Sequence, residues 1–212
     1  MSRNGIDFRA MIDRLFPPKY DFPKMLHEQA CTALKGVDRL LDWMKSDGSI
    51  NDDELMRIDM ALDDSRHRME NALLEAFTTP FDRRDIYSIA HQIGEVSDFV
   101  VSTQTEMKVL GVTADEPLIR MTETLRTGMA RFSDALCDVQ DDPVKAERLI
   151  REIRKAEHEI ESIYIEALAK VMSKEDAIEA LRRREIYHHM KDASRALGLA
   201  VDILHRIIVS IV

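Results

Sequence analysis

Apolar residues recur at intervals of three and four positions along six long segments of this 212-residue chain, and no segment shows the alternation of a half-buried strand. Such spacing places the apolar side chains on one face of an α-helix. The sequence therefore predicts an all-α fold, an elongated bundle of six long, nearly parallel helices. The predicted helices cover residues 21–44, 51–77, 79–109, 118–139, 142–171 and 185–209, and residues 173–176 begin a short turn or helix before the last one.

The third predicted helix has the strongest start signal. Thr79-Pro80-Phe81-Asp82 supplies an N-cap, a proline at the first helical position and an acid at the third. The helix before it is expected to end with Phe77 turned toward the core. A short apolar and basic lead at residues 8–16 precedes Pro17-Pro18, which is expected to break the backbone before the first long helix.

The sequence indicates an internal repeat of one helical module. Residues 111–117 lack periodicity near the midpoint, and similar elements follow one another in the same order on each side. An acidic pair precedes the motif Asp85-Ile-Tyr87 in the first half, and another precedes Glu185-Ile-Tyr187 in the second. We therefore expect a single domain, residues 1–212, with repeat one at about 20–110, a linker at about 111–117 and repeat two at about 118–210.

The acidic pairs are the candidate metal ligands. Asp59 and Asp63 lie four residues apart on one predicted helix, as do Glu157 and Glu161 on another. Two like charges at this spacing lie side by side and cost a few tenths of a kcal/mol. A cation would compensate, and hard oxygen ligands suit Mg, Ca, Mn or Fe. The alternative is that these acids are the solvated side of amphipathic helices.

Charge and composition exclude several classes. A formal net charge of −9 with only short basic runs argues against a nucleic-acid binder. The N-terminus lacks the apolar core of a signal peptide, and no stretch approaches the ~20 apolar residues of a membrane span. The two cysteines, Cys31 and Cys137, are expected to be reduced thiols of a cytoplasmic protein.

Three segments resemble a known family: Arg14 to Val37, Thr79-Pro-Phe-Asp-Arg-Arg-Asp-Ile-Tyr87, and Glu185-Ile-Tyr187. They look like the PhoU-related phosphate transport regulators, whose members are often encoded beside Pit-type phosphate transporters. The resemblance covers essentially the whole chain. It implies two three-helix repeats and a non-enzymatic regulator that contacts a phosphate transporter or its regulatory machinery, peripheral to the membrane at most, and it leaves homo-oligomers open.

The resemblance also implies surface metal clusters, of iron or zinc in some members. Its acidic pairs correspond to Asp59 and Asp63 in repeat one and to Glu157 and Glu161 in repeat two. On the facing helices the acids are Asp85, Glu95 and Asp98 in repeat one, and Asp192 and Asp202 in repeat two. Gly94, Arg195, Gly198 and Leu199 stand where relatives are commonly acidic. We therefore expect repeat two to bind a metal (Fe, Zn, Mg or Mn) more weakly than repeat one.

A helical di-metal carboxylate oxidoreductase is the alternative function. Such bundles use two Glu-x-x-His pairs and two further glutamates, all pointing inward. Glu185-Ile-Tyr-His188 has this spacing, and Asp64-Ser-Arg-His67 approximates it. No nucleophile arrangement or Gly-rich phosphate loop appears in the sequence, so the sequence favours the non-enzymatic hypothesis.

Overall fold

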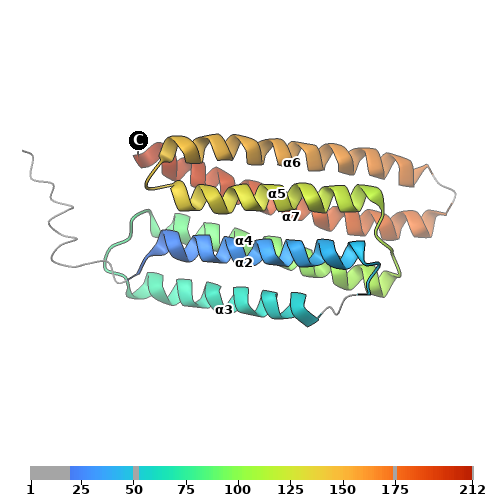
Figure 1. Cartoon of the computed structure of the whole chain (residues 1–212), viewed down its shortest axis with the longest axis horizontal. Helices are drawn as coiled ribbons and strands as arrows, with labels where there is room; N and C mark the ends of the chain where they lie inside the picture. Colours follow the sequence, from blue (N-terminus) through green and yellow to red (C-terminus); the bar gives the residue numbers. More distant parts are fainter. Residues whose placement is uncertain (1–19, 50–52, 174–175, 212) are drawn as a thin grey trace, which may run out of the picture.

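In the described part of the chain, six helices run side by side along the long axis (Figure 1). The structure is a computed structural model that describes residues 20–49, 53–173 and 176–211. Its helices are α2 (Phe22–Lys45), α3 (Asp53–Glu75), α4 (Arg83–Leu110), α5 (Glu116–Asp138), α6 (Pro143–Met172) and α7 (Ala177–Ile211). The predicted all-α bundle of long helices is therefore confirmed. The apolar lead at residues 8–16 lies outside the described residues.

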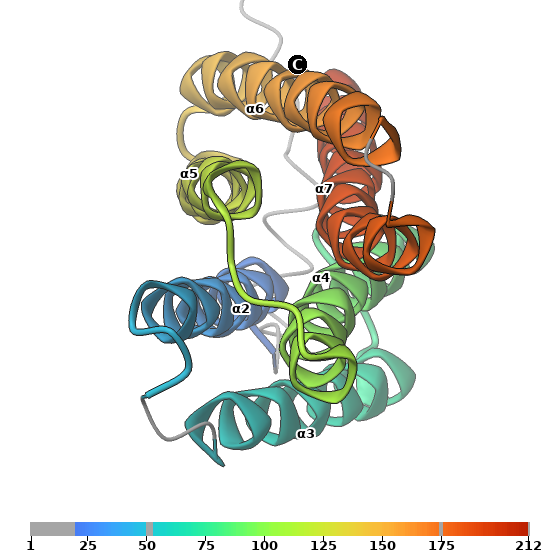
Figure 2. The same cartoon turned by 90° about the vertical axis from the view of Figure 1, so that its right-hand side faces the viewer.

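The helices form two sets of three, one above the other (Figure 2). Helices α2, α3 and α4 contact one another, and so do α5, α6 and α7. Contacts between α2 and α5 and between α4 and α7 join the two sets. Helices α3 and α6 lie on opposite outer sides and contact only the helices of their own set. The superposition of one set on the other stays a prediction.

Aspartate side chains fix where most of the helices begin. A carboxylate accepts backbone N–H groups that have no partner within the first turn of a helix. Asp82 accepts from Arg84 N at 2.8 Å, so α4 begins at Arg83. The prediction of Thr79 as the N-cap was wrong, because the Thr79 hydroxyl donates to the Phe81 carbonyl in a turn that precedes the helix. Asp21, Asp115, Asp142 and Asp176 cap α2, α5, α6 and α7 in the same way.

The last helix is longer than predicted. The start signal ending at Asp176 was identified from the sequence, but the helix that it opens continues without a break to Ile211. Residues 177–184 are rich in Ala, Leu, Glu and Arg, which favour helix, and contain no Gly or Pro. The predicted separate helix starting at residue 185 is therefore part of one 35-residue helix.

The C-terminal end of α3 is held by an arginine from α4. Arg83 Nη1 donates to the Leu73 carbonyl at 2.8 Å, and Nη2 donates to the carbonyls of Ala76 and Phe77. These carbonyls lie in and just after the last turn, where intrahelical partners are missing. Helix α3 ends at Glu75, and Phe77 is 82% exposed, so the prediction that Phe77 turns inward was wrong.

The core follows the predicted apolar faces. Leu62, Ile93, Leu125, Phe132 and Ile153 are each no more than 3% exposed. Burial of such side chains contributes roughly 1.5–3 kcal/mol each. No helix in the described ranges combines the length and apolarity needed to cross a bilayer.

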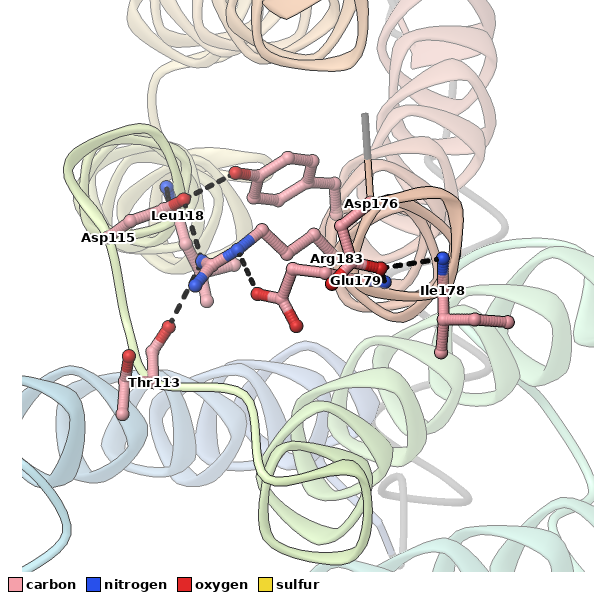
Figure 3. Close-up of polar contacts among 8 residues, drawn as sticks. Thr113, Asp115, Leu118, Asp176, Ile178, Glu179 and Arg183 are labelled. Atoms are coloured by element: carbon pink, nitrogen blue, oxygen red, sulfur yellow. Dashed lines mark hydrogen bonds and ion pairs between the residues drawn. The ribbon is translucent and has the colours of Figure 1, made fainter. Parts of the chain in front are cut away.

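A polar junction joins the linker between the two helix sets to the start of α7 (Figure 3). Gly111 ends α4 with a φ of +66°, which glycine adopts without strain. Asp115 caps α5 through Leu118 N and also accepts from Arg183 Nη1 at 3.0 Å and from the Tyr187 hydroxyl. Arg183 contacts the Thr113 carbonyl as well. One carboxylate thus ties α5, α7 and the linker together.

The junction also perturbs its own titratable groups. Burial, followed by the hydrogen bond to Asp115, raises the pKa of the Tyr187 phenol far above its usual range, so the hydroxyl stays protonated and donates. Burial opposes the charge of Arg183, but Asp115 and Glu179 outweigh it and raise the pKa of the guanidinium. Glu179 Oε1 lies 2.6 Å from Arg183 Nε.

Candidate functional site

Four acids of α3 and α4 lie together on one side of repeat one. We call Asp59, Asp63, Glu95 and Asp98 the acidic cluster. Asp59 and Asp63 are one helical turn apart on α3, and the other two belong to the facing part of α4. The Ser97 hydroxyl donates to Asp59 Oδ1 at 2.8 Å, which joins the two helices at this point.

The acidic cluster carries more negative charge than its neighbours balance. Partial burial raises the pKa of Asp98, and the charges of Asp59, Glu95 and Asp63 raise it further in that order. Arg66 is the cation that opposes this shift, and its Nη2 lies 2.9 Å from Asp63 Oδ1. The Arg66 guanidinium extends over Gly94, where a Cβ would lie 3.8 Å from Nη1. At Gly94, where the family resemblance predicts a carboxylate, the structure therefore has a neighbouring arginine.

Asp85 does not join the acidic cluster. It precedes Glu95 by ten residues, or about 15 Å along α4. Its carboxylate instead pairs with Arg206 of α7 and so links the two helix sets. Glu95 Oε1 lies 3.7 Å from His91 Nε2 one turn earlier.

Two of the three predicted acids of repeat two already have cationic partners. Arg154 Nη2 lies 2.9 Å from Asp202 Oδ1, and Lys191 Nζ lies 3.7 Å from Glu161 Oε1. A hollow of about 250 Å³ between α6 and α7 is lined by Glu157, Ile160, Glu161, Lys191, Ser194 and Arg195. Its wall therefore carries two positive and two negative side chains.

Glu157 lies directly against the backbone of α7. A Cβ on Gly198 would lie only 2.6 Å from Glu157 Oε1, closer than real Cβ contacts allow. Burial raises the pKa of Glu157, and the charge of Asp202 adds to the shift. Counting equal steps on from Tyr87 and Tyr187 places Gly198 at the position of Asp98, and Arg195 at that of Glu95. By this sequence count, the second helix set has a glycine and an arginine where the first has two acids.

The elements of the alternative di-metal site do not converge. Glu185 pairs with its neighbour Arg184 at 3.8 Å, and its side chain is 52% exposed. His188 Nε2 lies 3.3 Å from Asp192 on its own helix. His67 bonds to the Asp63 carbonyl on α3, in the other helix set, and Asp64 is exposed. The inward-pointing carboxylates that such a centre needs are not assembled by these residues.

Among solved structures, the chain is similar to a PhoU-like protein from Shewanella oneidensis MR-1. The TM-score is 0.75 with 11% sequence identity, over 90% of this chain and 100% of that one. A protein from the same organism, described as a PhoU-like phosphate regulatory protein, gives a TM-score of 0.71 at 11% identity and the same coverage. The chain has the PhoU-like fold. No protein-family model and no curated protein matches the sequence.

Within this PhoU-like fold, the predicted site residues separate into three groups. Repeat one brings Asp59, Asp63, Glu95 and Asp98 together. Repeat two holds Glu157, Glu161 and Asp202 among cations, and Asp85 lies apart from both. Over the ranges 20–49, 53–173 and 176–211, no set of three or more His, Cys, Asp or Glu side chains has the geometry of a metal site.

The cations beside the acids of both helix sets were not predicted from the sequence. Arg66 stands three residues after Asp63, a spacing at which opposite charges meet on a helix, so its role was open to prediction. Lys191 and Arg206 reach acids on other helices, at 30 and 121 residues' separation for the pairs with Glu161 and Asp85. No local pattern indicates such partners.

Proposed function

We propose that the chain is a non-enzymatic regulator or accessory protein of inorganic phosphate transport that acts by contact with another protein. The observation that carries this proposal is the likeness of 90% of the chain to a protein described as a PhoU-like phosphate regulatory protein. The partner that we propose is a Pit-type permease or its regulatory machinery, on the cytoplasmic side of the membrane.

Charge supports this choice of partner. The chain has a formal net charge of −9. The short cytoplasmic loops of membrane transporters carry an excess of Lys and Arg. An acidic helical surface and basic loops attract each other, and salt weakens that attraction when the charges are exposed.

Co-purification tests the proposal directly. The tagged protein, expressed in its native cells, should retain a phosphate permease at low ionic strength and lose most of it at high salt. Deletion of the gene should change phosphate uptake without removing any soluble enzyme activity. Failure to recover a transporter, together with a metal-dependent oxidase activity of the pure protein, would instead support the di-metal oxidoreductase alternative.

We also propose that repeat one binds a divalent or ferric ion through Asp59, Asp63 and Asp98, with Glu95 beside them. Four carboxylates are a suitable oxygen donor set for Mg, Mn or Fe, and the pKa of Asp98 is raised first by its partial burial and then by repulsion from the other three acids. Binding of a cation would require Arg66 to leave Asp63 and the four carboxylates to draw together. Repeat two fits less well, because Arg154 and Lys191 already neutralise its acids.

The metal proposal predicts opposite effects for two kinds of variant. Calorimetric titration with Mn²⁺ or Fe²⁺ should show at least tenfold weaker binding for Asp59→Asn, Asp63→Asn. The Arg66→Gln variant should bind more tightly, because it removes the competing cation. The matched control, Glu157→Gln, Glu161→Gln, removes the same charge from repeat two and should bind like the wild type. Equal loss in both double variants would show only a general charge effect.

A further inference from the structure

A second hollow lies on the seam between α3 and α4, closer to the start of α3 than the acidic cluster is. It has a volume of about 370 Å³, and its lining includes Asp53, Met56 and Arg57 of α3 and Gln104, Thr105 and Lys108 of α4. Gln104 follows Asp98 by six residues, about 9 Å along the helix. The hollow, which we call the α3–α4 pocket, is therefore separate from the cluster.

Hydrogen-bond donors dominate the polar lining of the α3–α4 pocket. Arg57 donates from Nε to the Asp53 carbonyl at 3.2 Å, and its guanidinium has no carboxylate within ion-pair distance in the described ranges. Lys108 adds a second positive charge. The Gln104 side chain is buried, with only 4% of the residue exposed, yet its carboxamide nitrogen has no hydrogen-bond partner among the described residues.

An unpartnered buried donor is unfavourable by about 1–3 kcal/mol, which a ligand with acceptor oxygens would relieve. The guanidinium, ammonium, carboxamide and Thr105 hydroxyl together match a small oxyanion, which offers several acceptors and a negative charge. Asp53 is the exception, because a carboxylate repels an anion unless the anion carries a proton to donate. Inorganic phosphate keeps a proton at neutral pH, whereas sulfate has none.

We propose that the α3–α4 pocket binds inorganic phosphate, with Arg57, Lys108, Gln104 and Thr105 donating to its oxygens and Asp53 accepting a hydrogen bond from its hydroxyl group. The inference goes beyond the transporter contact and does not depend on it, because binding is measured on the purified chain alone. A failure to bind phosphate would therefore not contradict the proposed transporter contact, and a missing transporter contact would not contradict phosphate binding.

The chain supplies its own probe for this binding. Trp43 is its single tryptophan, and Lys108 Nζ lies 5.6 Å from the centroid of the Trp43 ring. A phosphate that engages Lys108 should change the fluorescence of this ring. Titration with phosphate at constant ionic strength should give a saturating change, and titration with sulfate should give a response at least tenfold weaker in affinity.

Three variants separate binding from folding. Arg57→Gln and Gln104→Leu should each weaken phosphate binding about tenfold or more, and Gln104→Leu should not destabilise the protein, because it removes a buried carboxamide nitrogen that has no partner in the described part of the chain. Arg68→Gln makes the same charge change on an exposed part of α3 outside the pocket and should bind phosphate like the wild type. No saturable response to phosphate, equal affinity for sulfate, or unchanged binding by Arg57→Gln would each overturn the proposal.

Discussion

An Asp115→Ala variant should lose about 3 kcal/mol of unfolding free energy, the loss typical of removing one partner from a partly buried, hydrogen-bonded charge pair. The carboxylate accepts from Leu118 N, Arg183 and the Tyr187 hydroxyl, so alanine leaves three donors without their acceptor. Tyr187 is only 2% exposed, and water cannot readily replace the lost acceptor there. The midpoint of thermal unfolding should fall by about 6–12 °C.

The matched control is Asp142→Ala, the same substitution at the N-cap of α6. Asp142 accepts from Lys145 N at 2.9 Å, and no hydrogen bond to another helix is found for it within the described part of the chain. This variant should lose about 1 kcal/mol, the usual contribution of a cap. Denaturant titrations at pH 7 compare the two. Equal losses would mean that the contacts of Asp115 with α7 contribute nothing to stability.

The second large effect is expected at Arg83. Its replacement by alanine removes the donors that satisfy the Leu73, Ala76 and Phe77 carbonyls and should lower the unfolding free energy by about 2 kcal/mol. The last turn of α3 should fray before the rest of the molecule unfolds. Hydrogen exchange measures this directly, because the amides of residues 72–75 should lose protection while those of α5 keep theirs.

The adjacent Arg84 provides the control for this prediction. Its side chain is 89% exposed and pairs with Asp82 at 3.1 Å, a surface contact that salt screens. Arg84→Ala should therefore leave the exchange of residues 72–75 unchanged. If both arginine variants fray α3 equally, the effect comes from the loss of charge near the helix end and not from the capping of α3.

Periodicity in the sequence predicted the helices well because each face is set by local spacing. Ile93 and Phe132 lie at predicted inward positions and are at most 1% exposed. The errors occurred where a contact between elements decides the outcome. Phe77 continues the apolar period of α3, but the bonds from Arg83 end that helix first. Thr79 is a good N-cap by residue type, yet it bonds within a turn and Asp82 takes the role.

The candidate site was predictable only in part for the same reason. The spacing of Asp59 and Asp63 places them on one helix face whatever the fold does. Whether an acid meets another acid or a cation depends on the partner helix, so the pairing of Asp85 with Arg206 was not evident. Gln104 reads as an ordinary helical residue, and only the structure shows that its buried carboxamide nitrogen has no partner among the described residues.

Because α3 lies on the outside of the bundle, it can open locally while the other helices stay packed. Helices α2, α4, α5 and α7 form a continuous four-helix body, and α3 touches only α2 and α4. Opening of this one helix breaks no contact between the two helix sets, so it requires less free energy than global unfolding. Both the acidic cluster and the α3–α4 pocket lie on the seam by which α3 is attached. Ions bound at this seam would stabilise the closed state and so lower the fraction of molecules in which α3 is open.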